Sequence, residues 1–130
     1  MELTFTAPTR PLSINESNRM HWAARKRRLE GWKLLTIAAY RDAEKKEKAS
    51  VEGKPCTIEV HLPFERAGRR DAHNYTGTVV KTIVDALVTA GLVPDDTPEW
   101  VTVKDPQLVV DKTSRVRIIV TTNNPRRNTA

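Results

Sequence analysis

Two apolar patterns of different period, separated by one loop, constrain the fold most strongly. In residues 57–62, apolar side chains alternate with polar ones, which predicts a strand with one buried face that ends at Pro63. In residues 76–90, apolar side chains recur at i, i+3, i+4 and i+7, which predicts an amphipathic helix. Gly91 stands where a C′ glycine ends such a helix. The chain therefore combines a sheet with helices packed against it.

The remaining segments supply the other elements. A short alternating strand is expected at residues 3–6, and a long helical segment without internal proline runs from about 20 to 48. Short strands are expected on either side of Pro106, at 100–104 and 108–110, and the last strand at 115–121. We therefore expect a single α+β domain over residues 1–122, with a mixed β-sheet and two helices in the order β-α-β-α-β-β, and a basic flexible tail at 123–130.

Composition indicates a small basic protein. The 130 residues suffice for one domain with a modest core. Lys and Arg outnumber Asp and Glu by 22 to 16, and the formal charge of +6 favours a polyanionic partner. The single cysteine, Cys56, excludes an intrachain disulfide and is expected in the core on a strand. Because the sequence shows no signal peptide and no membrane-spanning apolar run, we expect a cytoplasmic protein without a membrane partner. We also expect no nucleotide cofactor.

Acidic residues cluster in one part of this basic chain. Asp71, Asp85 and the pair Asp95-Asp96 fall within 26 residues, together with Lys81. Carboxylates are ligands that Mg²⁺ prefers, and the bound ion polarises a phosphate and lowers the pKa of a bound water. A lysine nearby could neutralise phosphate charge in the transition state. We interpret the cluster as a metal site that acts on a nucleic-acid backbone.

This interpretation requires Asp71 and Asp96 to approach each other. A helix over 76–90 is roughly 20 Å long at 1.5 Å per residue. The segment 91–96 extends over about 20 Å at most. Asp96 therefore returns to the start of the helix, where Asp71 and His73 are expected, only if the segment runs nearly straight or the helix starts later.

Each acidic residue also has an ordinary structural interpretation. Lys81 and Asp85 stand at i,i+4 and could form a solvated ion pair. The segment 95–98 could be a turn in which an aspartate caps the following residues. Asp71 could form a loop salt bridge with a neighbouring arginine.

In combination these residues resemble a known family. The run RRDAHNYTGTVVKTIVDALVTAGLVPDDTPEWV, residues 69–101, resembles the signature of the RusA family of Holliday junction resolvases. In that family an R-D-x-D-N segment is followed by a lysine, D-x-L-x-x-A-G and an Asp-Asp pair. The run PLSINESNRMHWAARKRR, residues 11–28, is similar to the family's opening, with an asparagine and a basic helix start. The versions carried by phages and prophages are similar to this chain.

The resemblance implies an activity, a cofactor and partners. It implies a homodimeric, Mg²⁺-dependent endonuclease, with Mn²⁺ as a possible substitute, that resolves four-way DNA junctions by paired nicks. Its expected place is the cytoplasm of a bacterial or phage-infected cell. The resemblance assigns catalysis to Asp71, Asp96 and Lys81, and metal binding to Asp71, Asp85, Asp95 and Asp96.

Two features depart from the family pattern. His73, also a catalytic candidate, stands where the motif has its second aspartate. A histidine there either ligates a divalent metal, with preference for Mn²⁺ over Mg²⁺, or orients water. Asp85 or Asp95 could supply the missing carboxylate. The residues 75–80 make an insertion before Lys81, which changes the angular position of that side chain on its helix.

DNA contacts are expected from the basic helix and from the motif. The cations at 25–28 circle the helix, so a subset at i,i+3, Arg25 and Arg28, is expected to line a DNA-facing surface. The other expected DNA-binding residues are Asn15, Arg19, Arg69, Arg70 and Asn74. Trp22 and Trp32 are expected in the core or in a dimer contact rather than as base-stacking groups.

Two other functions are compatible with the sequence. One is a Mg²⁺ nuclease that cuts flaps, forks or other intermediates of phage replication. The other is a catalytically weakened branched-DNA binding protein, because His73 replaces a carboxylate. Cleavage of matched four-way and three-way substrates separates the first from a junction resolvase. Junction binding in EDTA without nicking in Mg²⁺ or Mn²⁺ identifies the second.

Overall fold

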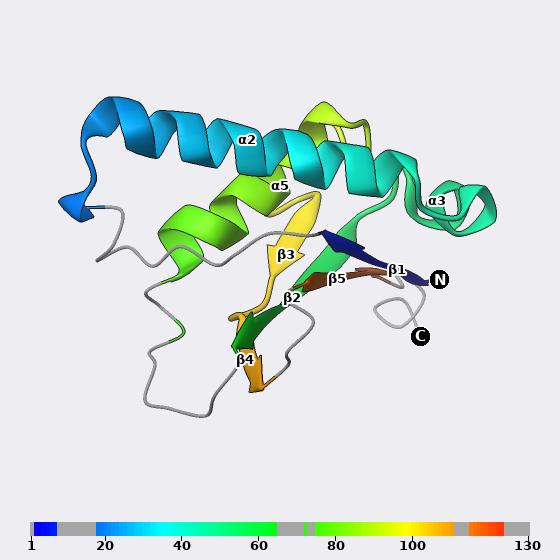
Figure 1. Ribbon diagram of the computed structural model, residues 1–130. Helices are drawn as coiled ribbons and strands as arrows, with labels where there is room; N and C mark the ends of the chain where they lie inside the picture. Colours follow the sequence, from blue (N-terminus) through cyan, green and yellow to red (C-terminus); the bar gives the residue numbers. More distant parts are fainter. Residues whose placement is uncertain (1, 8–17, 65–71, 73–74, 111–114, 124–130) are drawn as a thin grey trace.

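The computed structural model describes residues 2–7, 18–64, 72, 75–110 and 115–123 (Figure 1). The elements in these ranges are β1 (Glu2–Ala7), α2 (Trp22–Arg41), α3 (Lys45–Val51), β2 (Cys56–Phe64), the π-helix η1 (Thr76–Val80) that continues as α5 (Lys81–Thr89), β3 (Val101–Val103), β4 (Gln107–Val110) and β5 (Val116–Thr122). They confirm the predicted α+β class. No helix in the described ranges is long and apolar enough to cross a membrane.

The strands form one mixed sheet with β2 near its centre. The order is β1-β5-β2-β3, and β4 also pairs with β2. β5 runs antiparallel to both neighbours, with Ile118 opposite Phe5 on one side and opposite Val60 on the other. β3 and β4 lie parallel to β2. The helix between β2 and β3 is therefore the crossover that parallel strands require.

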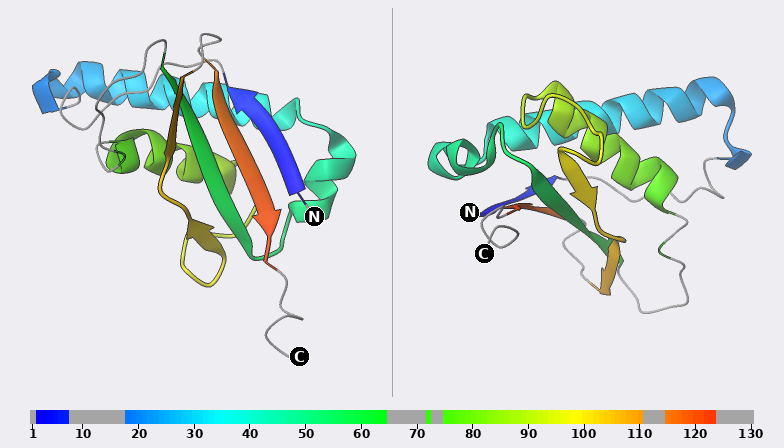
Figure 2. Two further views of the ribbon diagram at one scale, coloured as in Figure 1. Left: turned by 90° about the horizontal axis from the view of Figure 1, so that it is seen from below. Right: turned by 180° about the vertical axis from the view of Figure 1, so that it is seen from behind.

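Helices α2 and α5 cover one face of the sheet (Figure 2). Alternate residues of each strand point into this layer, because successive side chains of a strand lie on opposite faces. The buried layer contains Leu3, Phe5, Cys56, Ile58, Val60, Leu62, Val116, Ile118 and Val120 from the strands and Ile83, Val84 and Leu87 from α5. Cys56 is thus the buried strand residue that the sequence predicts, and burial raises the pKa of its thiol.

The helix between β2 and β3 has an irregular start and a regular end. Over Thr76–Val80 it is a π-helix, in which the N–H of Lys81 donates to the carbonyl of Thr76. A π turn changes the direction in which the following side chains point. At the other end Gly91 has φ +98°. The N–H after it donates to the carbonyl of Leu87 at 3.0 Å, which is the Schellman arrangement. The predicted C′ glycine is confirmed.

The helix predicted over 20–48 is two helices, and three strands rather than the two of the predicted order follow α5. The observed order is therefore β-α-α-β-α-β-β-β. At the break, the ammonium of Lys48 in α3 donates to the carbonyl of Arg41 at 2.7 Å and satisfies an open carbonyl at the end of α2. Val51, the last residue of α3, is fully buried. The break turns the chain so that Val51 enters the core, and residues 49–51, which lie beyond the predicted end of the helix, are helical.

Two further boundaries differ from the prediction. β2 continues through Pro63, which the sequence predicts as its end. The ladder between β2 and β5 ends at His61, so among the described strands only β4 pairs with β2 at Pro63. The missing N–H of proline can face the side without a described partner. Asn123, predicted as the first residue of the tail, accepts a hydrogen bond of 2.7 Å from Thr57. The rest of the predicted tail, 124–130, lies outside the described residues.

Candidate functional site

One face of α2 is buried in the core in the C-terminal half of the helix and lies at the surface in the N-terminal half. We call this face a stripe. In the C-terminal half, Ile37 and Tyr40 of this stripe are buried. At spacings of three and four residues the stripe continues backwards through Lys33 and Leu29 to Trp22. The N-terminal half of α2 extends beyond the sheet, as Figures 1 and 2 show. There the stripe lines a surface groove beside the helix formed by η1 and α5.

Acidic residues gather at one end of this groove. A cavity of about 210 Å³ is lined by Lys33, Asp85, Val88, Thr89, Asp95 and Asp96. Three of the carboxylates predicted as metal ligands therefore share one cavity. The loop after Gly91 brings Asp95 and Asp96 beside the second half of α5 rather than to the start of η1.

The other end of the groove is basic and aromatic. A larger cavity of about 480 Å³ is lined by Trp22, Arg25, Lys26 and Lys33 from α2 and by Lys81 and Asp85 from α5, among others. Lys33 and Asp85 line both cavities, so the two meet at this pair. We call the whole the α2–α5 groove. Carboxylates outnumber cations at the first end, and cations outnumber carboxylates at the second.

Lys81 and Asp85 line the groove without forming an ion pair. Neither side chain forms a salt bridge or hydrogen bond among the described residues, although the two stand at i,i+4 on α5. The ordinary surface pair that their spacing allows is therefore not formed. Both charges face the groove, where a ligand can reach them.

The neighbouring aspartates 95 and 96 differ in their partners. Oδ1 of Asp95 accepts hydrogen bonds from the hydroxyl of Thr97 at 2.6 Å and from its backbone N–H at 2.9 Å. The hydroxyl bond, followed by the N–H bond, holds the pKa of Asp95 below its ordinary value. Asp96 has no such partner within the described parts of the chain. Asp95 is thus the turn-capping residue of the ordinary interpretation, and Asp96 is the carboxylate left open to a ligand.

Several predicted site residues lie outside the described residues: Asn15, Arg69, Arg70, Asp71, His73 and Asn74. The approach of Asp71 to Asp96 therefore stays a prediction. Among the expected DNA-binding cations, Arg25 lines the groove and Arg19 is exposed just before α2. Arg28 is half-buried and does not line the groove.

The carboxylates of the groove suit a hard cation but do not complete a site. Mg²⁺ takes oxygen ligands, usually one or two carboxylates together with water and substrate phosphate. Asp85 and Asp96 offer such oxygens. In the described ranges, however, no three side chains of His, Cys, Asp or Glu lie close enough to hold a metal ion. A fuller protein ligand set would need Asp71 or His73.

Trp22 and Lys33 are among the groove residues that were not predicted as site residues. Trp22, expected in the core or in a dimer contact, is 65% exposed, whereas Trp32 is 4% exposed and belongs to the core. Lys33 stands between the acidic and basic ends. The four-residue spacing from Arg25 through Leu29 to Lys33 places it on one helix face and is the signal in the sequence that indicates it.

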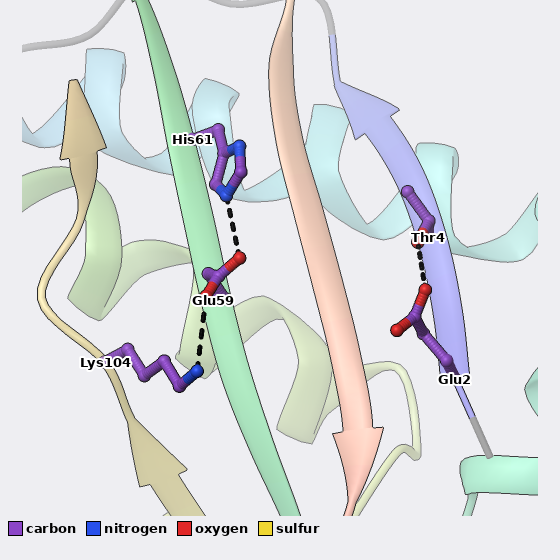
Figure 3. A network of polar contacts seen from close by, with 5 residues as sticks. All are labelled: Glu2, Thr4, Glu59, His61 and Lys104. Carbon is purple, nitrogen blue, oxygen red and sulfur yellow. Dashed lines mark hydrogen bonds and ion pairs between the residues drawn. The ribbon is translucent and has the colours of Figure 1, made fainter. Parts of the chain in front are cut away.

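A separate polar network lies on the face of the sheet away from the helices (Figure 3). The ring of His61 and Oε2 of Glu59, both on β2, are 2.8 Å apart, and the ammonium of Lys104 lies 3.4 Å from Oε1 of Glu59. These contacts lower the pKa of Glu59, and the hydrogen bond with His61 contributes most. The network is on the opposite side of the sheet from the groove and is not part of it.

Comparison with known proteins identifies no family for this chain. A scan against protein-family models finds no match, and neither does a search of curated proteins. The likeness to the RusA family therefore rests on the motif in residues 69–101 and is carried forward as a proposal.

Proposed function

We propose that the protein is a Mg²⁺-dependent, structure-selective endodeoxyribonuclease of the RusA type that resolves four-way DNA junctions by paired nicks. The observation that supports this proposal is the groove between α2 and α5, in which an end with excess negative charge meets an end with excess positive charge. It combines Asp85 and Asp96, two of the predicted metal ligands, with Lys81, the predicted catalytic lysine. A nuclease needs both kinds of charge, because carboxylates hold the cation and lysines neutralise the phosphate.

The proposed role of each groove residue follows from its position in the groove. Asp85 and Asp96, together with Asp71, would hold Mg²⁺, which when bound would supply Lewis acidity and a water of lowered pKa. Asp95 orients the turn that presents Asp96. Lys81 and the newly identified Lys33 offset negative charge on the scissile phosphate.

The basic wall of the groove attracts the DNA strand. Arg25 and Lys26 continue the line of positive charge beyond Lys81. These cations act on phosphates, so affinity should depend strongly on salt and weakly on base sequence. Paired nicks on opposite strands need two such grooves, and a homodimer supplies them. The proposed setting is the cytoplasm of a bacterial or phage-infected cell.

Cleavage of a labelled mobile four-way junction in Mg²⁺, in Mn²⁺ and in EDTA tests the proposal. We expect symmetrical paired nicks that require the metal and that Asp96→Asn abolishes. Asp105→Asn is the matched control, because Asp105 is an exposed aspartate between β3 and β4 that does not line the groove. Absence of metal-dependent nicking in the unmodified protein, or full activity of Asp96→Asn, would contradict the proposal.

The same assay separates the two alternatives. Preferred cutting of three-way, flap or fork substrates identifies a replication nuclease. Tight junction binding in EDTA without nicking in either metal identifies a branched-DNA binding protein, which the replacement of a family aspartate by His73 would explain.

A further inference from the structure

A tryptophan lies on the surface at the basic end of the α2–α5 groove. The indole of Trp22 is 65% exposed, whereas Trp32 further along the same helix is 4% exposed. One exposed apolar side chain means little by itself, since folded proteins carry many. The surroundings of Trp22 decide whether it serves as a binding surface.

The first turn of α2 holds Trp22 in place. His21 is the N-cap, and its Nδ1 accepts the N–H of Ala23 at 3.2 Å. The His21 ring stacks on the indole, with ring centroids 5.8 Å apart and planes inclined by 30°. An aromatic ring fixed in this way loses little conformational freedom when a second planar group stacks on it.

The cavity beside Trp22 is basic and large enough for a nucleotide. Its wall carries four cations and two carboxylates, which are Arg25, Lys26, Lys33, Lys81, Glu30 and Asp85. Positive charge is therefore in excess. The volume of about 480 Å³ lies within the range of roughly 300–1,000 Å³ that small-molecule sites occupy. An aromatic ring beside a row of cations is the arrangement that single-stranded nucleic acids recognise.

We propose that this end of the groove binds one unpaired nucleotide of the branched DNA, with the base stacked on Trp22 and the phosphates held by Arg25, Lys26 and Lys81. The inference rests on the proposed function and assigns a further binding residue to it. A base within a duplex is covered by its neighbours, so only a base at a branch point, gap or single-stranded arm reaches the indole. Because every base has a π face, the site responds to loss of pairing rather than to sequence.

The test measures binding of the full chain in EDTA to two single strands with the same number of phosphates, an oligothymidylate and its abasic counterpart. We expect the unmodified protein to bind the oligothymidylate about tenfold more tightly. Trp22→Ala removes this preference and leaves the salt dependence unchanged, because Trp22 carries no charge. Trp22→Phe retains most of the preference. Equal affinity of the unmodified protein for both strands, or an intact preference in Trp22→Ala, overturns the inference.

Leu34→Ala is the matched control. Leu34 is 67% exposed on α2 and does not line the groove, so the preference should persist when it is truncated. Circular dichroism checks that each variant is folded. If Trp22→Ala does not fold, fluorescence decides the matter: the oligothymidylate should quench indole emission of the unmodified protein, the abasic strand should not, and Trp22→Phe should lose the quenching. Quenching that survives in Trp22→Phe overturns the inference.

The result is independent of nuclease activity, because EDTA prevents metal-dependent cleavage. A protein that cuts no junction but prefers the oligothymidylate through Trp22 contradicts the nuclease proposal and supports the stacking site. A protein that cuts junctions but binds both strands equally supports the nuclease proposal and overturns the stacking site.

Discussion

The hydroxyl of Tyr40 donates a hydrogen bond of 2.6 Å to Oε1 of Glu52 and so ties the last turn of α2 to the residue that follows α3. Tyr40 is almost fully buried, and its ring packs edge-on against Phe5 with centroids 5.8 Å apart. This bond spans the break that the helix pattern did not predict. It therefore stabilises the turn that lets α3 reach the core.

Tyr40→Phe should destabilise the fold by about 1–2 kcal/mol at neutral pH, because a buried hydrogen bond to a carboxylate is lost. Burial, followed by the bond and the charge of Glu52, raises the pKa of Tyr40 well above its ordinary value of 10.0. The unfolded chain therefore loses this proton first, and the contribution declines as pH rises from 10 toward the folded pKa. Urea denaturation from pH 7 to 10.5 should show the stability difference shrinking. A difference that stays constant would contradict the assignment.

Gly91→Ala should destabilise the protein by about 1 kcal/mol, because only glycine adopts φ +98° without strain. Gly31→Ala is a matched comparison and should stabilise it by about 0.5–1 kcal/mol, since Gly31 lies inside α2. A Cβ added at either position meets nothing within 4 Å, so the opposite signs come from the backbone alone. Urea denaturation measures both, and equal signs would contradict this account.

Glu59→Gln should reduce stability by at most about 1 kcal/mol at pH 7, because the network with His61 and Lys104 is partly exposed to solvent. The pKa of Glu59 is lowered in the folded protein, so the contribution is present above the ordinary value of 4.5. It is lost as pH falls through the lower folded value. Thermal denaturation between pH 7 and 3 should show the two proteins converging in acid. Divergence in acid would rule out the proposed role of the carboxylate.

Lys33→Met tests whether Lys33 contacts a DNA phosphate, because it removes the charge without shortening the side chain much. Loss of one phosphate contact should reduce the slope of log affinity for junction DNA against log salt by about one. Lys46→Met is the control, because Lys46 is exposed on α3, which Figure 1 shows beyond the opposite end of α2. Fluorescence anisotropy in EDTA at several salt concentrations gives both slopes. An equal decrease in the two variants would indicate a general charge effect.

Asp71→Asn should abolish cutting and leave junction binding largely intact, because the proposed role of Asp71 is to hold the metal. His73→Asp should shift the metal preference toward Mg²⁺, since aspartate supplies the harder ligand. Cleavage and binding assays in Mg²⁺ and Mn²⁺ measure both effects. Retained cleavage by Asp71→Asn removes the metal role, and an unchanged Mg²⁺/Mn²⁺ activity ratio in His73→Asp shows that His73 is not a ligand.

Features that depend on neighbouring residues were predictable from the sequence, whereas features that depend on residues far apart in the chain were not. The strand around Ile58 and the end of α5 at Gly91 were predictable, because alternation and a glycine at C′ are local patterns. The break after Arg41 was not, since no glycine or proline marks it. Trp22 and Trp32 show the same limit: both are tryptophans on one helix, yet only Trp32 packs in the core.

The sequence by itself determined the fold class, because the strand and helix periods require a sheet with helices on it, and it named the acidic residues and lysine of the candidate site. The tertiary structure decided which of them lie together. Asp85, Asp96 and Lys33 share a cavity only because α2 packs beside α5 and the loop after Gly91 folds back along the helix. Such contacts join residues far apart in the chain, and no pattern of neighbouring residues encodes them.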